Sequence, residues 1–168
     1  MKKIAVKVSD IDKEIIKKIQ ENEMITLSLL APEFPEYHIS MIWKRVSLLK
    51  GAGIIQTIDG MYQIADGINI TDKTNEIVIS PDMLNITGTH VAILKLLYDR
   101  GKKTKFAFIR HKLKLTQWKA LHNIEMLIFL GMVRKEKKGI YEITPIGKQL
   151  LEDEDTKKIF KKILKKKT

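Results

Sequence analysis

The chain has 168 residues, 44% of them hydrophobic, and a net charge of +11. This composition excludes a disordered polar tail and allows one or two packed cores. No apolar run approaches the ~20 residues of a membrane-spanning helix, and the absence of cysteine excludes disulfide frameworks, thiol nucleophiles and Cys-based zinc sites. Because the basic start of the chain is not followed by an apolar signal core, we expect a cytoplasmic protein.

The sequence pattern of residues 1–66 predicts three helices followed by a β-hairpin. Ser9 and Asp10 are suited to cap the first helix, and residues 26–31 predict a short second helix. Pro35 predicts the start of the third helix, since proline is tolerated in a first helical turn. The apolar stripe expected on one side of this third helix is formed by Ile39, Ile42, Trp43, Val46 and Leu49.

The hairpin prediction rests on the Asp59-Gly60 pair, which lies between the apolar runs 54–58 and 61–65. Asp-Gly between apolar runs is a strong signal for a two-residue turn. Residues 67–87 are more polar and predict a linker, with a possible edge strand at 76–79.

The second half of the chain predicts the same order of elements. A helix begins near residue 88, and Thr116 is a suitable N-cap for a later helix that Gly131 ends. Residues 132–136 and 140–144 then predict two strands around a basic Lys-Lys-Gly turn.

An offset of 78 residues aligns the two halves, as an internal repeat would. It places Ile15, Ile16 and Ile19 on Ile93, Leu94 and Leu97, and Gly53 on Gly131. One further residue of offset aligns Gly60-Met61-Tyr62 with Gly139-Ile140-Tyr141. We therefore predict an α+β, mostly helical fold with one unit in 1–66, a linker in 67–87, a second unit in 88–147 and a basic amphipathic helix in 148–168.

A family resemblance rests on these residues. The run Leu113-Lys114-Leu115-Thr116-Gln117, with Ala120, Ile124, Leu127 and Gly131-Met132-Val133 after it, resembles the helix-turn-helix core of winged-helix regulators. Tyr141, Ile143, Thr144, Gly147 and Leu150 resemble the end of the wing in MarR-like and archaeal-type regulators. The resemblance implies a helix that enters the major groove of double-stranded DNA and a hairpin that contacts its backbone or minor groove.

The distribution of charge agrees with a polyanionic partner, because residues 88–143 contain thirteen basic and only four acidic residues. In the second unit, the side chains expected to contact DNA come from the helix-turn-helix and the wing. They are Lys103, Lys105, Arg110, Lys112, Lys114, Gln117, Lys119, His122, Asn123, Arg134, Lys135, Lys137 and Lys138. The alternative interpretation of the wing is a hairpin that is charged only for solubility.

In the first unit, the third helix predicts an outward face that could read bases. This face includes His38, Ser40, Lys44 and Arg45, whereas the first wing, residues 56–59, has no basic side chain. The sequence leaves open whether this unit contributes to the same DNA surface or binds protein.

Trp118 and Leu121 depart from the family pattern, because DNA-reading helices usually carry small polar residues there. The simpler interpretation is that the first unit or the C-terminal helix buries this side. The alternative is a subunit interface, and with it a homodimer.

The C-terminal segment repeats apolar residues amid lysines, with Ile159, Phe160, Ile163 and Leu164 on one stripe. Three interpretations remain: packing on its own unit, a dimerisation helix, or a helix that lies on a membrane surface.

Enzymatic motifs are missing from the sequence. The four histidines His38, His90, His111 and His122 lack metal-ligand spacing, and no phosphate-binding loop or nucleophile elbow occurs. We therefore expect no catalytic residues, metal or cofactor. The expected function is double-stranded DNA binding, as a transcriptional regulator, and the alternative is a tandem winged-helix adaptor that binds protein in a larger assembly.

Overall fold

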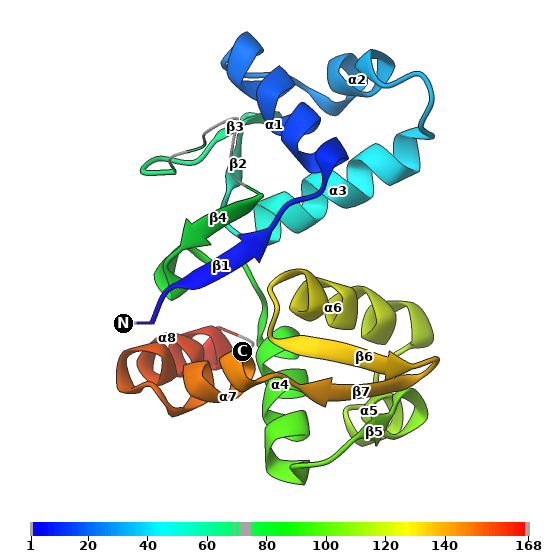
Figure 1. The fold of residues 1–168 in the computed structure, drawn as a ribbon, viewed down its shortest axis with the longest axis vertical. Helices are drawn as coiled ribbons and strands as arrows, with labels where there is room; N and C mark the ends of the chain where they lie inside the picture. Colours follow the sequence, from blue (N-terminus) through cyan, green and yellow to red (C-terminus); the bar gives the residue numbers. More distant parts are fainter. Residues whose placement is uncertain (1, 69, 71–74, 167–168) are drawn as a thin grey trace. The chain divides into compact units, whose positions relative to one another are not determined.

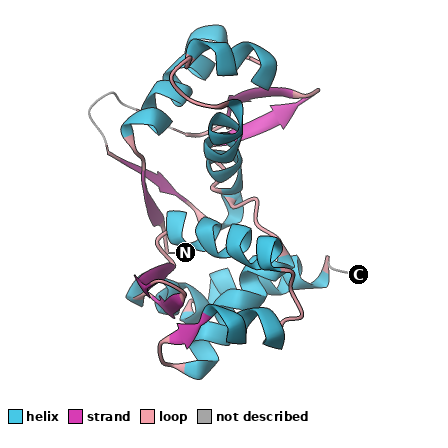
Figure 2. Cartoon of the chain, turned by 90° about the vertical axis from the view of Figure 1, so that its right-hand side faces the viewer, coloured by secondary structure: helices cyan, strands magenta, loops and turns pink. Residues whose placement is uncertain are grey.

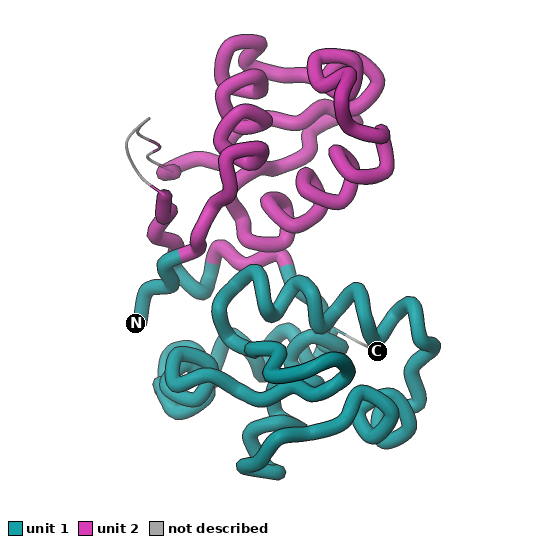
Figure 3. The backbone as a smooth tube through the Cα atoms, turned by 45° about the vertical axis from the view of Figure 1, so that its right-hand side comes forward, with its two compact units in different colours: residues 1–5, 80–82, 86–168 teal, residues 6–79, 83–85 magenta. Residues whose placement is uncertain are grey.

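The computed structural model describes residues 2–68, 70 and 75–166, and its fold is α+β and mostly helical (Figures 1 and 2). The chain divides into two compact units (Figure 3). We call residues 6–79 and 83–85 the N-terminal unit, and residues 1–5, 80–82 and 86–168 the C-terminal unit.

The N-terminal unit contains a helix-rich half and a hairpin. Its elements are α1 (Asp10–Asn22), α2 (Leu27–Leu30), the 3-10 turn η1 (Ala31–Glu33), α3 (Ile39–Gly51), β2 (Ile55–Ile58) and β3 (Met61–Ile64). β2 and β3 pair antiparallel around the Asp59-Gly60 turn, as predicted. A separate two-stranded sheet joins β1 (Ile4–Lys7) to β4 (Glu76–Ile79), the strand expected in the polar segment.

The predicted start of the third helix at Pro35 is wrong, because α3 begins four residues later. His38 is the N-cap residue: its Nδ1 accepts the Ser40 backbone N–H at 3.2 Å. A cap at His38 satisfies a free donor of the first turn, which Pro35 could not do.

The C-terminal unit has the same order of helices and hairpin, with one more strand inside it and two more helices after it. Its elements are α4 (Gly88–Arg100), β5 (Thr104–Lys105), α5 (Phe106–Lys112), α6 (Gln117–Phe129), β6 (Val133–Lys137), β7 (Ile140–Ile143), α7 (Pro145–Glu152) and α8 (Glu154–Lys165), and the 3-10 turn η2 (Pro81–Met83) precedes them. β5, β7 and β6 form an antiparallel sheet in that order. β5 was not predicted, because two residues are too short to show a strand period.

The repeat extends to backbone conformations. α1 and α4 each have 13 residues and begin at Asp10 and Gly88, and α3 and α6 each have 13 residues and begin at Ile39 and Gln117. Three pairs of residues with positive φ correspond: Glu23 with Gly101, Gly53 with Gly131, and Gly60 with Gly139, whereas Asp59, Gly67 and Lys114 have positive φ without a counterpart in the other unit. The isolated bridge Ile25–Tyr62 corresponds to the Thr104–Tyr141 pair of the three-stranded sheet. The chain thus contains two helix–helix–hairpin units of one design.

The C-terminal segment packs on its own unit, as the simplest interpretation predicted. α8 contacts α4 and α7, and Phe160 and Thr156 on α8 are buried. Asp153 separates α7 from α8, because its Oδ2 accepts the Thr156 backbone N–H at 2.9 Å and so caps α8.

Candidate nucleic-acid interface

The helix-turn-helix of the C-terminal unit is formed by α5, the turn at residues 113–116, and α6. Thr116 caps α6 by accepting the Lys119 backbone N–H at 3.2 Å, as predicted. The turn is closed by a 2.9 Å hydrogen bond from the Leu115 N–H to the Arg110 carbonyl, and Lys114 has a φ of +53°. Ile109 on α5 and Ala120 and Ile124 on α6 are fully buried, so both helices are anchored in the core of the unit.

The β6–β7 hairpin, residues 133–143, is the expected wing and is called the wing below; its tip is hydrogen-bonded to the start of α5. The Phe106 N–H at the start of α5 donates to the Gly139 carbonyl in the wing turn at 2.8 Å, and Lys105 pairs with Ile140. α5 has only seven residues, so about 10 Å of helix separates the wing turn from the end that leads into α6. Figure 1 draws the hairpin tip and the start of α6 at the same end of the unit.

Two of the predicted phosphate contacts are occupied within the protein. Lys103 Nζ lies 3.0 Å from Glu136 Oε2, and Arg134 Nη2 lies 3.2 Å from Glu136 Oε1. Arg134 also pairs with Glu142. These two cations and two carboxylates cancel, so the net positive charge of the wing comes from residues nearer its tip.

The remaining predicted cations line the exposed surface from β5 to the wing. Within the described residues, the following lysines are exposed and have no carboxylate partner: Lys105, Lys112, Lys114, Lys119, Lys135, Lys137 and Lys138. A β-bulge between Lys135 and Lys137 interrupts the ladder just before the turn. Arg110 is half-buried.

The prediction that Asn123 points outward is wrong. Only 5% of Asn123 is exposed, and its Nδ2 donates to the Lys119 carbonyl at 2.7 Å. Asn123 follows Ala120 by three positions and precedes Leu127 by four, which places it on the buried stripe of α6. Gln117 and Lys119 are exposed as expected, and His122 is half-buried.

Trp118 is exposed, in contrast to the interpretation that another part of the chain buries it. Its exposed fraction is 68%, and that of Leu121 is 41%. The Trp118 indole stacks on the His122 imidazole, with ring centroids 5.2 Å apart and planes inclined by 3°. The corresponding surface of α3 is also exposed, because 42% of Trp43 and 48% of Ile39, two residues of the predicted apolar stripe, are accessible.

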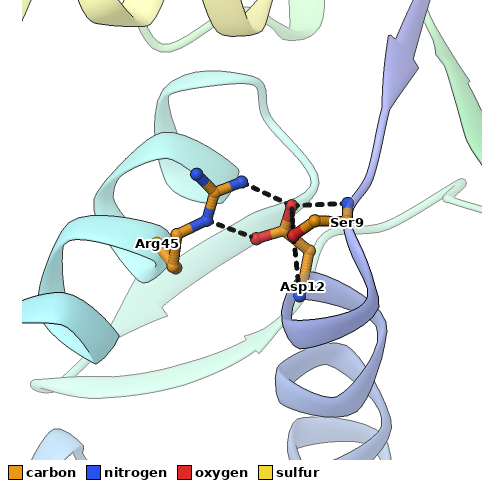
Figure 4. Close-up of polar contacts among 3 residues, drawn as sticks. All are labelled: Ser9, Asp12 and Arg45. Atoms are coloured by element: carbon orange, nitrogen blue, oxygen red, sulfur yellow. Dashed lines mark hydrogen bonds and ion pairs between the residues drawn. The ribbon is translucent and has the colours of Figure 1, made fainter. Parts of the chain in front are cut away.

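In the N-terminal unit, most of the predicted base-reading side chains make local contacts. His38 Nδ1 lies 2.7 Å from Ser40 Oγ, and Arg45 makes a two-point ion pair with Asp12 (Figure 4). The prediction that Arg45 faces outward is therefore wrong. Lys44 is exposed.

Asp12 is the residue that sequence reasoning missed. It is fully buried, and its Oδ2 accepts the Ser9 N–H and the Ser9 hydroxyl, each at 2.9 Å, as well as Arg45 Nη2. The Ser-x-x-Asp spacing at a helix start is a variant of the capping box and could have indicated this arrangement.

No helix among the described residues is long and apolar enough to cross a membrane. In that part of the chain, no group of three or more His, Asp or Glu side chains is placed to hold a metal ion. No protein-family model, curated protein or solved structure matches the chain.

Proposed function

We propose that this chain is a tandem winged-helix protein that binds double-stranded DNA through its C-terminal unit and acts as a transcriptional regulator. In this proposal α6 lies in the major groove and the β6–β7 wing contacts the phosphate backbone. The helix–strand–helix–helix–hairpin order and the β5-β7-β6 sheet are compatible with such a domain.

The observation that carries the proposal is the hydrogen bond between Phe106 and Gly139. It holds the wing turn against the start of α5, so that the lysines of the wing tip and those of the helix-turn-helix belong to adjoining elements. Lysines arranged around a reading helix are suited to neutralise phosphates and to fix the helix in the groove. The N-terminal unit supports this role less, because Arg45, His38 and Ser40 are engaged within that unit.

Salt dependence of binding is the direct test. If about six phosphates are neutralised, log K falls with log salt at a slope of roughly −5. Replacing Lys135, Lys137 and Lys138 by Ala should reduce the magnitude of that slope by about 2 to 3 and weaken binding to every duplex sequence.

The matched control removes three exposed lysines from the C-terminal end of the same unit. Lys161, Lys162 and Lys166 are exposed and lie at or just after the end of α8. The control variant with these lysines changed to Ala has the same net charge and should keep the slope of the unmodified protein. A slope near zero for the unmodified protein contradicts the proposal.

A protein-binding adaptor is the second candidate. It is favoured by the exposed side chains of Trp118 and Leu121, which are apolar at positions where a base-reading helix is usually polar. An adaptor would show little retention of random duplex in a gel shift at ~0.15 M salt, whereas a DNA-binding protein would be retained.

A further inference from the structure

Trp118 has the highest exposed fraction among the large apolar side chains of the described residues, and one face of its ring nonetheless stacks on another side chain. It is the second residue of α6 and lies one helical turn before His122. The near-parallel stack on His122, with centroids 5.2 Å apart, supports one face of the indole. With 68% of the side chain accessible, much of the ring remains open to a ligand.

Three exposed lysines stand close to this aromatic pair in the sequence. Lys119 follows Trp118 directly in the sequence. Lys112 is the last residue of α5, and Lys114 lies in the turn that leads into α6. All three lysines are exposed. An open aromatic face together with lysines is the combination by which proteins bind unpaired nucleotides, because each base can stack while its phosphate meets a cation.

A continuous duplex gives such a ring little to bind. Both faces of a paired base are already covered by its neighbours in the stack, so an aromatic ring gains contact only at unpaired, terminal or unstacked bases.

We propose that Trp118 stacks on an unpaired base, and that the preferred ligand of the C-terminal unit is DNA in which duplex adjoins a single-stranded segment. This inference rests on the proposed DNA-binding function and specifies its substrate. The two units differ here, since Ser40 and Lys44 in α3 occupy the positions of Trp118 and His122 in α6.

The chain contains two tryptophans, which makes Trp118 observable by fluorescence. In the Trp43→Phe variant, all tryptophan emission comes from Trp118. This variant is titrated with a duplex of about 20 base pairs, roughly two helical turns, and with the same duplex extended by about six unpaired thymines. We expect the extended DNA to quench the emission much more strongly than the blunt duplex, whose only unstacked base faces are those of its two ends.

Affinity provides the second measurement. The Trp118→Ala variant should bind the extended DNA about tenfold or more weakly and the blunt duplex with unchanged affinity, because one stacked base is lost. Trp118→Phe should retain most of the preference, and both variants should unfold at the temperature of the unmodified protein, since little of Trp118 is buried.

The remaining outcomes separate the two proposals. If the Trp118→Ala variant binds both DNAs as the unmodified protein does, stacking is refuted and duplex binding stands. Equal weakening on both DNAs refutes a preference for unpaired bases. If neither DNA is bound, the proposed function fails as well. If Trp118→Ala instead lowers the mass measured by light scattering, Trp118 is a self-association contact and the inference is overturned.

Discussion

Asp12 and Arg45 form a two-point ion pair in the N-terminal unit, with Arg45 Nε 2.7 Å from Oδ1 and Nη2 2.6 Å from Oδ2 (Figure 4). Asp12 is inaccessible to solvent, and the Arg45 side chain is 22% exposed. A buried carboxylate requires such partners, because removing one leaves a charge that water cannot reach.

Replacing Arg45 by Met should destabilise the N-terminal unit by about 3 to 5 kcal/mol, since the Asp12 carboxylate would keep only its Ser9 donors. The measurement is the urea midpoint of unfolding, followed by circular dichroism. Lys17→Met is the matched control, because Lys17 lies on the exposed side of α1 and should change stability by less than about 0.5 kcal/mol. Adding Asp12→Ala to Arg45→Met should restore part of the loss, and a fully additive result would show that the two side chains are not coupled.

This ion pair also shows which features could be predicted from the sequence. The caps at Ser9 and Thr116 and the turn at Asp59-Gly60 were correct because each depends on a few neighbouring residues. The orientation of Arg45 depended on Asp12, which is 33 positions away, and no local pattern reports that distance.

The other source of error was deciding which sides of α6 are exposed to solvent and which are buried. Because α6 is apolar on several sides, we predicted that Trp118 is buried, and we placed Asn123 among its outward polar residues; the structure reverses both. Periodicity identifies a helix but does not distinguish a packed apolar side from an open one when nearly every side is apolar. Ion pairs across the wing, such as that of Lys103 with Glu136, likewise required the sheet order to be known.

His90 occupies in α4 the position that Asp12 has in α1, the third residue of a capping box. Its Nδ1 accepts the Thr87 backbone N–H at 2.9 Å, and burial, together with the nearby His122, lowers its pKa from 6.5 to about 4. Below pH 6.5 the unfolded chain takes up a proton at this residue, whereas the folded chain does so only near pH 4. Stability should therefore fall as the pH decreases through this window, by about 3 kcal/mol in total from this group.

His90→Gln is the informative variant, because glutamine can also bond back to the N-cap N–H but does not titrate. As the pH falls from 6.5 to 4, the unmodified protein should lose unfolding free energy relative to the His90→Gln variant. An NMR titration of the His90 ring with an inflection near 6.5 would contradict the expected protonation behaviour.

Gly53 and Gly131 stand at the same position of the two units and differ in their surroundings. Both have a positive φ, +76° and +71°. A Cβ on Gly53 would lie 2.1 Å from the Met83 carbonyl oxygen, whereas a Cβ on Gly131 would meet nothing within 4 Å. Gly131→Ala should cost about 1 to 2 kcal/mol from backbone conformation alone. Gly53→Ala should cost about 3 kcal/mol or more, because the Met83 backbone must also move. Equal losses in urea unfolding would show that the close approach relaxes freely.

If the proposed function is correct, the carboxylates of the wing should lower the affinity for duplex DNA. Glu136 and Glu142 hold Lys103 and Arg134 in ion pairs, so these cations have to exchange one anionic partner for another before they neutralise a phosphate. Replacing both glutamates by Gln should raise duplex affinity and make the slope of log K against log salt steeper by about 1 to 2.

The control for this prediction makes the same change of charge elsewhere in the C-terminal unit. Glu152 and Glu154 lie at the end of α7 and the start of α8, and their double Gln variant carries the same net charge. If only net charge matters, both double variants will strengthen binding alike and the wing has no special role. If Lys103 and Arg134 meet phosphate, only the wing variant will change the slope, because the number of counterions released depends on which cations contact the backbone rather than on total charge.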